Sequence, residues 1–158
     1  MELKRVVVTG LGAITPIGND VAATWDNAVK GVSGAGPITH FDASLFKTQF
    51  GCEVKNFNAT EHFDRKEVRK YDLYAQYALV AARQAVADAG IDAEGVDHDR
   101  VGVIFAAGIG GLHTFEEEAG YYESHKELGP KYNPFFIPKM IADIAAGHIS
   151  MQYRFRGP

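Results

Sequence analysis

Residues Val101–Gly111 read Val-Gly-Val-Ile-Phe-Ala-Ala-Gly-Ile-Gly-Gly, an apolar run that ends in a loop rich in glycine. A short apolar run without polar alternation is typical of a strand that is buried on both faces. Val6, Val7 and Val8 form a second run of this kind, which also leads into glycines. We therefore predict two buried strands, at 6–8 and 101–107, each followed by a glycine loop.

Helical patterns lie between and after these two segments. Capping and breaking residues mark the predicted helices: from Asn19 or Asp20 to Gly31, from Asp72 to Gly90, around 114–126, and from Pro138 through His148. The last helix is expected to end near Tyr153, where Arg-Phe-Arg-Gly-Pro follows. Strands that alternate with helices predict the α/β class.

Composition excludes several classes of protein. The net charge of -4 is opposite to the basic footprint of a general nucleic-acid binder, and the single cysteine, Cys52, excludes an internal disulfide framework. The six histidines show no metal-binding spacing, so no metal site is predicted. The apolar stretch near the N-terminus is too short for a signal peptide or a membrane span, so we expect a cytoplasmic protein without membrane insertion.

Two candidate sites are weak on inspection. Thr9-Gly10-Leu11-Gly12 follows a predicted strand, but the sixth position of a dinucleotide fingerprint is Thr15, and no strand-ending acid follows. A tight structural turn is therefore favoured over a nucleotide loop. Cys52 stands beside Glu53, which opposes thiolate formation, so a structural or merely exposed cysteine is favoured over a nucleophile.

Three further features leave alternatives open. The loop Gly108-Ile109-Gly110-Gly111 is either a tight turn or a place where a ligand approaches the end of a strand. Arg65, Lys66, Arg69 and Lys70 share one helical face, which is either simply solvated or attracts an anionic partner. Phe135 and Phe136 stand between prolines and suit a core, an interface or a pocket wall.

In this order along the chain, these pieces resemble a known family. The segments that carry the resemblance are 6–12, 15–19, Thr24-Trp25, Phe41-Asp42, 65–72, 108–112, 133–138 and Ala146-Gly147-His148. Together they are similar to the N-terminal portion of the β-ketoacyl-[acyl-carrier-protein] synthases, most closely type II. The resemblance covers essentially all 158 residues.

The resemblance implies a thiolase-like layered α/β fold, of which residues 1–158 would form the N-terminal half, incomplete in this chain. It implies an acyltransferase: a cysteine takes an acyl chain from acyl carrier protein, and the carbanion formed when malonyl-carrier loses CO2 attacks the thioester. Phosphopantetheine would arrive on the carrier, so no separate cofactor is expected. The implied partners are acyl carrier protein and, in a homodimer, a second copy of the enzyme.

The resemblance also assigns roles to residues. Gly108, Ile109 and Gly110, with Phe135 and Phe136, would line the acyl pocket, Ile109 as its gate and Phe136 reaching toward the partner subunit. Lys66, Arg69 and Lys70 would bind the carrier protein. No residue of this chain matches a catalytic position of the family, and the nucleophile is expected beyond Pro158. The alternatives are a polyketide-type ketosynthase, its cysteine-less chain-length partner, or a non-catalytic dimer-forming or carrier-binding module.

Overall fold

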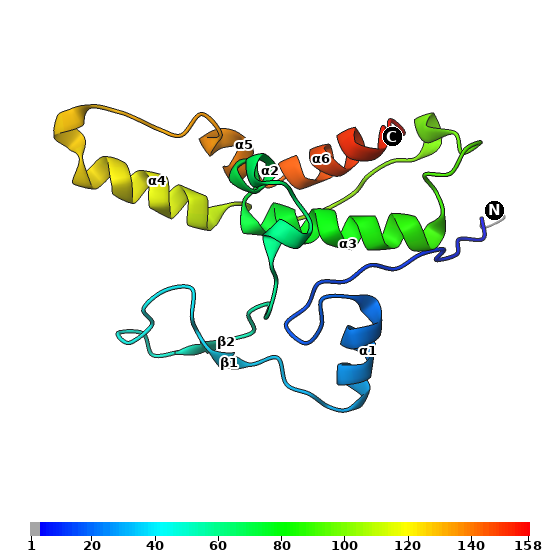
Figure 1. The fold of residues 1–158 in the computed structure, drawn as a ribbon, viewed down its shortest axis with the longest axis horizontal. Helices are drawn as coiled ribbons and strands as arrows, with labels where there is room; N and C mark the ends of the chain where they lie inside the picture. The colour runs from blue at the N-terminus through cyan, green and yellow to red at the C-terminus, as the bar shows by residue number, and fades with distance from the viewer. Residues whose placement is uncertain (1–3) are drawn as a thin grey trace. The chain divides into compact units, whose positions relative to one another are not determined.

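The structure is a computed structural model that describes residues 4–158. Its elements, in chain order, are α1 (Val21–Val29), β1 (Gly36–Pro37), β2 (Phe50–Gly51), η1 (Ala59–Glu61), α2 (Arg65–Lys70), α3 (Leu73–Ala89), η2 (His98–Arg100), α4 (Leu112–Ser124), η3 (Lys126–Leu128), α5 (Phe136–Met140) and α6 (Ile144–Tyr153), where η marks a single turn of 3-10 helix (Figure 1). The chain divides into two compact units, Met1–Phe57 with Val80–Ile91, and Asn58–Leu79 with Asp92–Pro158. Helix α3 contributes residues to both. Among the described residues, no helix has the length and apolar character needed to cross a membrane.

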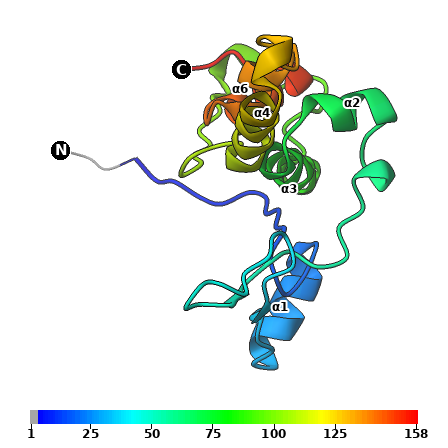
Figure 2. The ribbon, with the colours of Figure 1, turned by 90° about the vertical axis from the view of Figure 1, so that its left-hand side faces the viewer.

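The first unit contains α1 (Figure 2) and the short antiparallel pair β1–β2 (Figure 1). Helix α1 begins as predicted, because the Asp20 carboxylate accepts a 2.7 Å hydrogen bond from the Ala23 N–H. It ends before Gly31, whose φ of 68° is a left-handed conformation that glycine adopts without steric cost. Both ends of the helix are therefore determined by local interactions that the sequence predicts.

The glycines of the N-terminal loop bring its backbone against the second half of α3. A Cβ on Gly10 would lie 2.5 Å from the Ala89 nitrogen, so glycine is required there. Hydrogen bonds hold the loop on the helix: the Leu11 N–H donates to the Asp88 carboxylate at 2.9 Å, and the Ala13 N–H donates to the Gln84 side-chain oxygen at 3.0 Å. The tight turn favoured from the sequence for residues 9–12 is not formed there: this segment runs along α3 without a turn, and the turn follows at residues 16–17, inside the Thr15–Gly18 bridge.

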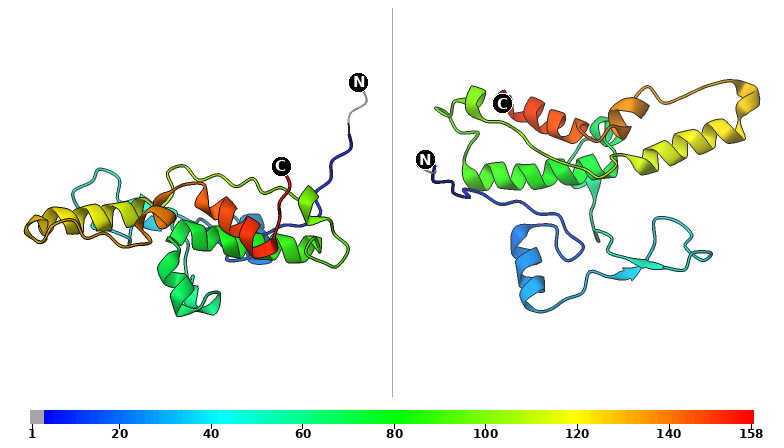
Figure 3. Two further views of the ribbon diagram at one scale, coloured as in Figure 1. Left: turned by 90° about the horizontal axis from the view of Figure 1, so that it is seen from above. Right: turned by 180° about the vertical axis from the view of Figure 1, so that it is seen from behind.

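In the second unit, α6 lies alongside the first turns of α3 (Figure 3). The contact between the helices is made of small side chains, since Ala75, Ala78 and Ala145 are all buried there, with Tyr71 and Tyr74 packed against them. Alanines at such a crossing let two helices approach closely. After Tyr153, Arg154 adopts a left-handed conformation and ends α6, as the sequence predicts.

Two predicted helices need correction. The helix expected around 114–126 is α4, which begins at Leu112 and ends at Ser124. The helix expected from Pro138 through His148 is two helices, α5 and α6, because the chain is extended at Ile141 (φ -66°, ψ 136°). The Tyr74 hydroxyl donates a 2.5 Å hydrogen bond to the Ile141 carbonyl and so stabilises the break from a neighbouring helix.

The two predicted buried strands are also corrected: neither forms within residues 4–158. A strand requires a neighbouring backbone that completes its ladder of hydrogen bonds, and the paired strands of the described residues are β1 and β2. Near the second run, the Gly157 N–H donates to the Val101 carbonyl at 3.0 Å. Ile104, in the middle of that run, is 99% exposed. The apolar pattern is therefore present without the pairing that would make it a strand.

Candidate functional site

The candidate acyl-pocket loop, Gly108–Gly111, connects the extended segment to α4 and lies against the end of α5. The Gly111 N–H donates to the Met140 carbonyl at 2.9 Å, which fixes the loop to the last residue of α5. Gly110 has a φ of 91°, where an L side chain is strained. The loop therefore has the close backbone approach that its glycines suggest, and the neighbouring backbone belongs to this chain.

The predicted aromatic pair stands at the other end of α5. Phe136 is the first residue of that helix, and its ring stacks on Phe115 of α4 with centroids 6.3 Å apart and on Tyr132 at 5.5 Å. Phe135 precedes it and remains partly exposed. The glycine loop and the aromatic pair thus lie at the two ends of α5, both beside the first turn of α4, and Ile109 is 67% exposed.

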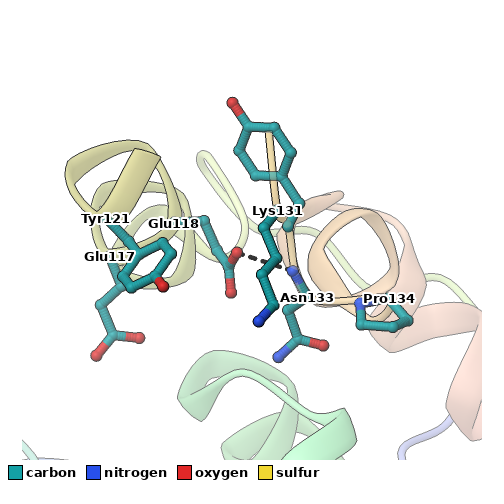
Figure 4. Close-up of a pocket in the computed structure, with 7 residues that line it drawn as sticks. Glu117, Glu118, Tyr121, Lys131, Asn133 and Pro134 are labelled. Atoms are coloured by element: carbon teal, nitrogen blue, oxygen red, sulfur yellow. Dashed lines mark hydrogen bonds between the residues drawn. The ribbon is translucent and has the colours of Figure 1, made fainter. Parts of the chain in front are cut away.

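A hollow of about 550 Å³ lies beside these helices, between α4 and the segment 131–134 (Figure 4). Glu118 accepts a 2.9 Å hydrogen bond from the Asn133 N–H at its wall. Its lining residues are Glu117, Glu118, Tyr121, Lys131, Tyr132, Asn133 and Pro134. None of the five residues predicted for the acyl pocket lines this hollow, and no motif singled out in the sequence predicts it.

The candidate carrier-binding face is carried by α2, a helix of six residues. Its start is a capping box: Asp64 accepts from the Lys66 and Glu67 backbone N–H groups at 2.7 and 2.8 Å, and Glu67 accepts from the Asp64 N–H at 3.1 Å. The hydrogen bond from the Glu67 N–H, followed by that of Lys66 and by the nearby lysine charges, lowers the pKa of Asp64. The Asp64 carboxylate is therefore kept ionised at the start of the helix, where a negative charge stabilises the free N–H groups of the first turn.

The cations of α2 are available to an outside partner. Lys66, Arg69 and Lys70 are exposed, and within residues 4–158 none of them takes part in a salt bridge. Lys70 and Arg69 occupy the last turn of the helix, where the macrodipole favours positive charge. The structure thus carries the three predicted residues on one short helix, in agreement with the helical face expected from their spacing in the sequence.

Other site types find no support in the described part of the chain. No cluster of histidine, cysteine and acidic side chains within residues 4–158 is arranged to hold a metal ion. Cys52 is exposed, next to β2. His148 is half-buried, its ring contacts Tyr71 with centroids 4.7 Å apart, and partial burial lowers its pKa. It belongs to an aromatic row that continues to Phe63, and that row is a packing feature.

Comparisons with known proteins give these features a context. Residues 3–158 match the family model "Beta-ketoacyl synthase, N-terminal domain". A "3-oxoacyl-[acyl-carrier-protein] synthase 2" of Staphylococcus aureus is 47% identical over 98% of this chain and 37% of its own length. The protein of the same name from Coxiella burnetii is 43% identical over 100% of this chain and 38% of its own length.

Solved structures agree with this likeness. A type II polyketide synthase acyl-carrier protein in complex with its ketosynthase matches 99% of this chain and 41% of that chain, at a TM-score of 0.77 and 25% identity. The ishigamide ketosynthase/chain length factor matches 96% of this chain and 38% of that chain, at a TM-score of 0.78 and 27% identity. The chain thus spans well under half the length of the relatives it matches, and its fold is that of the N-terminal half of thiolase-like ketosynthases.

Proposed function

The chain belongs to the β-ketoacyl synthase family, whose N-terminal domain it matches, and from this we propose that the whole protein is a β-ketoacyl-[acyl-carrier-protein] synthase that elongates fatty acids. The observation that carries the proposal is the 47% identity to a 3-oxoacyl-[acyl-carrier-protein] synthase 2 along nearly the entire chain. The polyketide ketosynthases it resembles in structure are less similar in sequence, at 25% and 27% identity. Fatty-acid elongation is therefore favoured over the polyketide alternative.

The reaction is a decarboxylative condensation. A cysteine thiolate attacks the thioester of acyl-carrier, which releases the carrier thiol and leaves the acyl group on the enzyme. Malonyl-carrier then loses CO2, and the resulting carbanion attacks the acyl-enzyme carbonyl, expelling the cysteine thiolate and forming β-ketoacyl-carrier. Cys52, exposed beside β2, is not the proposed nucleophile. No metal or nucleotide is needed, because the phosphopantetheine arm of the carrier supplies the thiols.

This chain contributes the surroundings of that chemistry. We assign the acyl pocket to Gly108, Ile109 and Gly110 together with Phe135 and Phe136. The position of Ile109 supports its role as gate, since it is an exposed apolar side chain beside a glycine loop. Phe136 is assigned to a homodimer contact, where it would approach the partner subunit's pocket.

We assign carrier binding to Lys66, Arg69 and Lys70 on α2. Carrier recognition by such a face is electrostatic, so it should weaken as salt shortens the range of charge interactions from about 10 Å at 0.1 M to about 3 Å at 1 M. The capping box at Asp64 supports this role, because it holds a six-residue helix in shape at the protein surface.

A charge-reversal experiment on the full-length protein tests this proposal. The pair Lys66→Glu and Lys70→Glu is compared with Lys30→Glu and Lys47→Glu, two exposed lysines outside α2, so that the net charge changes equally. We expect the first pair to raise the KM for malonyl- and acyl-carrier by about tenfold at 50 mM salt, with a smaller effect at 500 mM. Equal effects of both pairs would refute the assignment of α2.

The same preparations decide between a catalyst and a non-catalytic module. The wild-type protein should convert acyl-carrier and malonyl-carrier into β-ketoacyl-carrier and CO2, detected by mass spectrometry of the carrier. Tight carrier binding without any β-ketoacyl product would support the non-catalytic alternative instead. Sedimentation of the same sample reports whether the protein is a dimer.

A further inference from the structure

A buried carboxylate joins the start of α3 to the start of α4. Asp72 is 7% exposed and Thr114 is 3% exposed, and the Thr114 hydroxyl donates to the Asp72 carboxylate at 2.5 Å. The other carboxylate oxygen accepts from the Tyr74 N–H at 3.3 Å. Within residues 4–158 Asp72 has no salt-bridge partner. Because a buried charge is costly unless its hydrogen bonds are made, the Thr114 hydroxyl is important for keeping this carboxylate in place.

The downstream half of the acyl-pocket loop is packed directly onto this pair. A Cβ on Gly111 would lie 2.9 Å from the Asp72 carboxylate oxygen and would also meet the Lys139 carbonyl. A Cβ on Gly110 would lie 2.9 Å from the Ala142 nitrogen. Gly111 is therefore packed against both Asp72 and α5, and the adjoining Gly110 is packed against the end of α5 and the residues that follow it.

The upstream half of the loop is different. A Cβ on Gly108 would meet no atom within 4 Å, and Ile109 is 67% exposed. The boundary between enclosed and open backbone thus falls between Ile109 and Gly110. The backbone that follows Ile109, at Gly110 and Gly111, is therefore packed against other residues, whereas the backbone that precedes it, at Gly108, is open.

We propose that Asp72 and Thr114 are positioning residues that hold Gly110 and Gly111 in place. The side chain of Ile109 then moves while the backbone after it stays fixed, when it admits or excludes an acyl chain. We call the contact of the Asp72–Thr114 pair with the glycine loop the clamp. The clamp rests on the contacts of Asp72 described above, whereas the identity of the ligand as an acyl chain rests on the proposed function. Neither residue touches the acyl chain in this proposal. They act on acyl-chain selection through the conformation of the loop.

The test uses three variants of the full-length protein. Thr114→Val removes the hydroxyl at nearly constant shape, Thr114→Ser retains it, and Thr60→Val is the control, since Thr60 makes its hydroxyl hydrogen bond to Asn58 on the surface. Amide hydrogen exchange is measured at Gly111 and Phe115. The kcat/KM for octanoyl-carrier is compared with that for hexadecanoyl-carrier.

We expect Thr114→Val to speed exchange at these amides by about ten- to hundredfold relative to those of α6, as loss of a buried bond to a charged group implies. Its preference between the two acyl donors should move toward unity by at least about threefold, while Thr114→Ser and Thr60→Val stay near wild type. Unchanged exchange in Thr114→Val overturns the clamp. Faster exchange with an unchanged acyl preference overturns the positioning role.

Two outcomes separate this inference from the proposed function. If the wild-type protein elongates neither donor, the proposed function fails and so does the acyl role of the loop, but exchange in the variants still decides whether the clamp exists. If Thr114→Val does not fold, Thr114→Ala takes its place with the same expected exchange and the same Thr114→Ser comparison.

Discussion

Replacing Gly12 by alanine should destabilise the protein, because the N-terminal loop and α3 are in backbone contact there. A Cβ at this position would meet the Ala81 carbonyl and lie 2.8 Å from the Ala85 nitrogen, closer than a real Cβ comes to a neighbouring atom. Both obstacles are main-chain atoms, so no side-chain rotation relieves them. The loop must move away from the helix, which strains the hydrogen bonds from Leu11 to Asp88 and from Ala13 to Gln84.

The expected loss follows from these contacts. Overpacking costs about 1–3 kcal/mol, and each of the two weakened hydrogen bonds adds about 0.5–1.5 kcal/mol, so we expect a loss of about 2–6 kcal/mol in the free energy of unfolding. Urea denaturation of the full-length protein, followed by circular dichroism at 222 nm, measures it. Gly36→Ala is the matched control, since a Cβ there would meet nothing within 4 Å. That variant should be neutral or more stable by up to about 1 kcal/mol. Equal denaturation midpoints for the two variants would refute the reasoning.

Further outcomes are expected elsewhere in the chain. Leu79→Ala, at a fully buried side chain, should cost about 2–5 kcal/mol in urea denaturation, whereas Leu45→Ala, at a side chain 96% exposed, should stay within about 0.5 kcal/mol. Burial lowers the pKa of His148, so the unfolded chain takes up a proton at this residue more readily than the folded chain does. The stability that neutral His148 contributes should therefore be fully present above about pH 6.5 and be lost as the pH is lowered. Melting temperatures measured from pH 7.5 to 5 should show that His148→Asn reduces this fall, and an unchanged fall in that variant would contradict the assignment to His148. Ile109→Phe should suppress elongation of hexadecanoyl-carrier more than of octanoyl-carrier; equal losses for both donors would indicate misfolding instead.

Helix ends were predictable from the sequence because local chemistry determines them. The Asp20 carboxylate bonds to an N–H three residues away, and Gly31 and Gly90 adopt positive φ where the helices before them end. The basic residues of α2 were likewise visible as a set. The capping box of this helix is visible in the sequence as Asp64 and Glu67, three residues apart.

The remaining features depend on residues that are distant in the sequence. The break between α5 and α6 is held by Tyr74, 67 positions before Ile141, and the Asp72–Thr114 contact spans 42 positions. Contacts between residues so far apart in the sequence leave no periodic pattern from which they could be predicted. The two predicted strands failed for a related reason: the apolar run around Ile104 records a preference for burial, but a strand also needs a partner, which no apolar run specifies by itself.

The single tryptophan determines what optical methods can report about this chain. Trp25 lies on α1 in the first unit, and the residue is 69% exposed already in the folded state. Its emission should therefore be close to that of indole in water and should change little when the chain unfolds. Helix α6 and the glycine loop lie in the other unit and would be silent in such a measurement. A tryptophan introduced at Phe155, which is buried against His98 and Tyr153, would give that unit its own fluorescent signal.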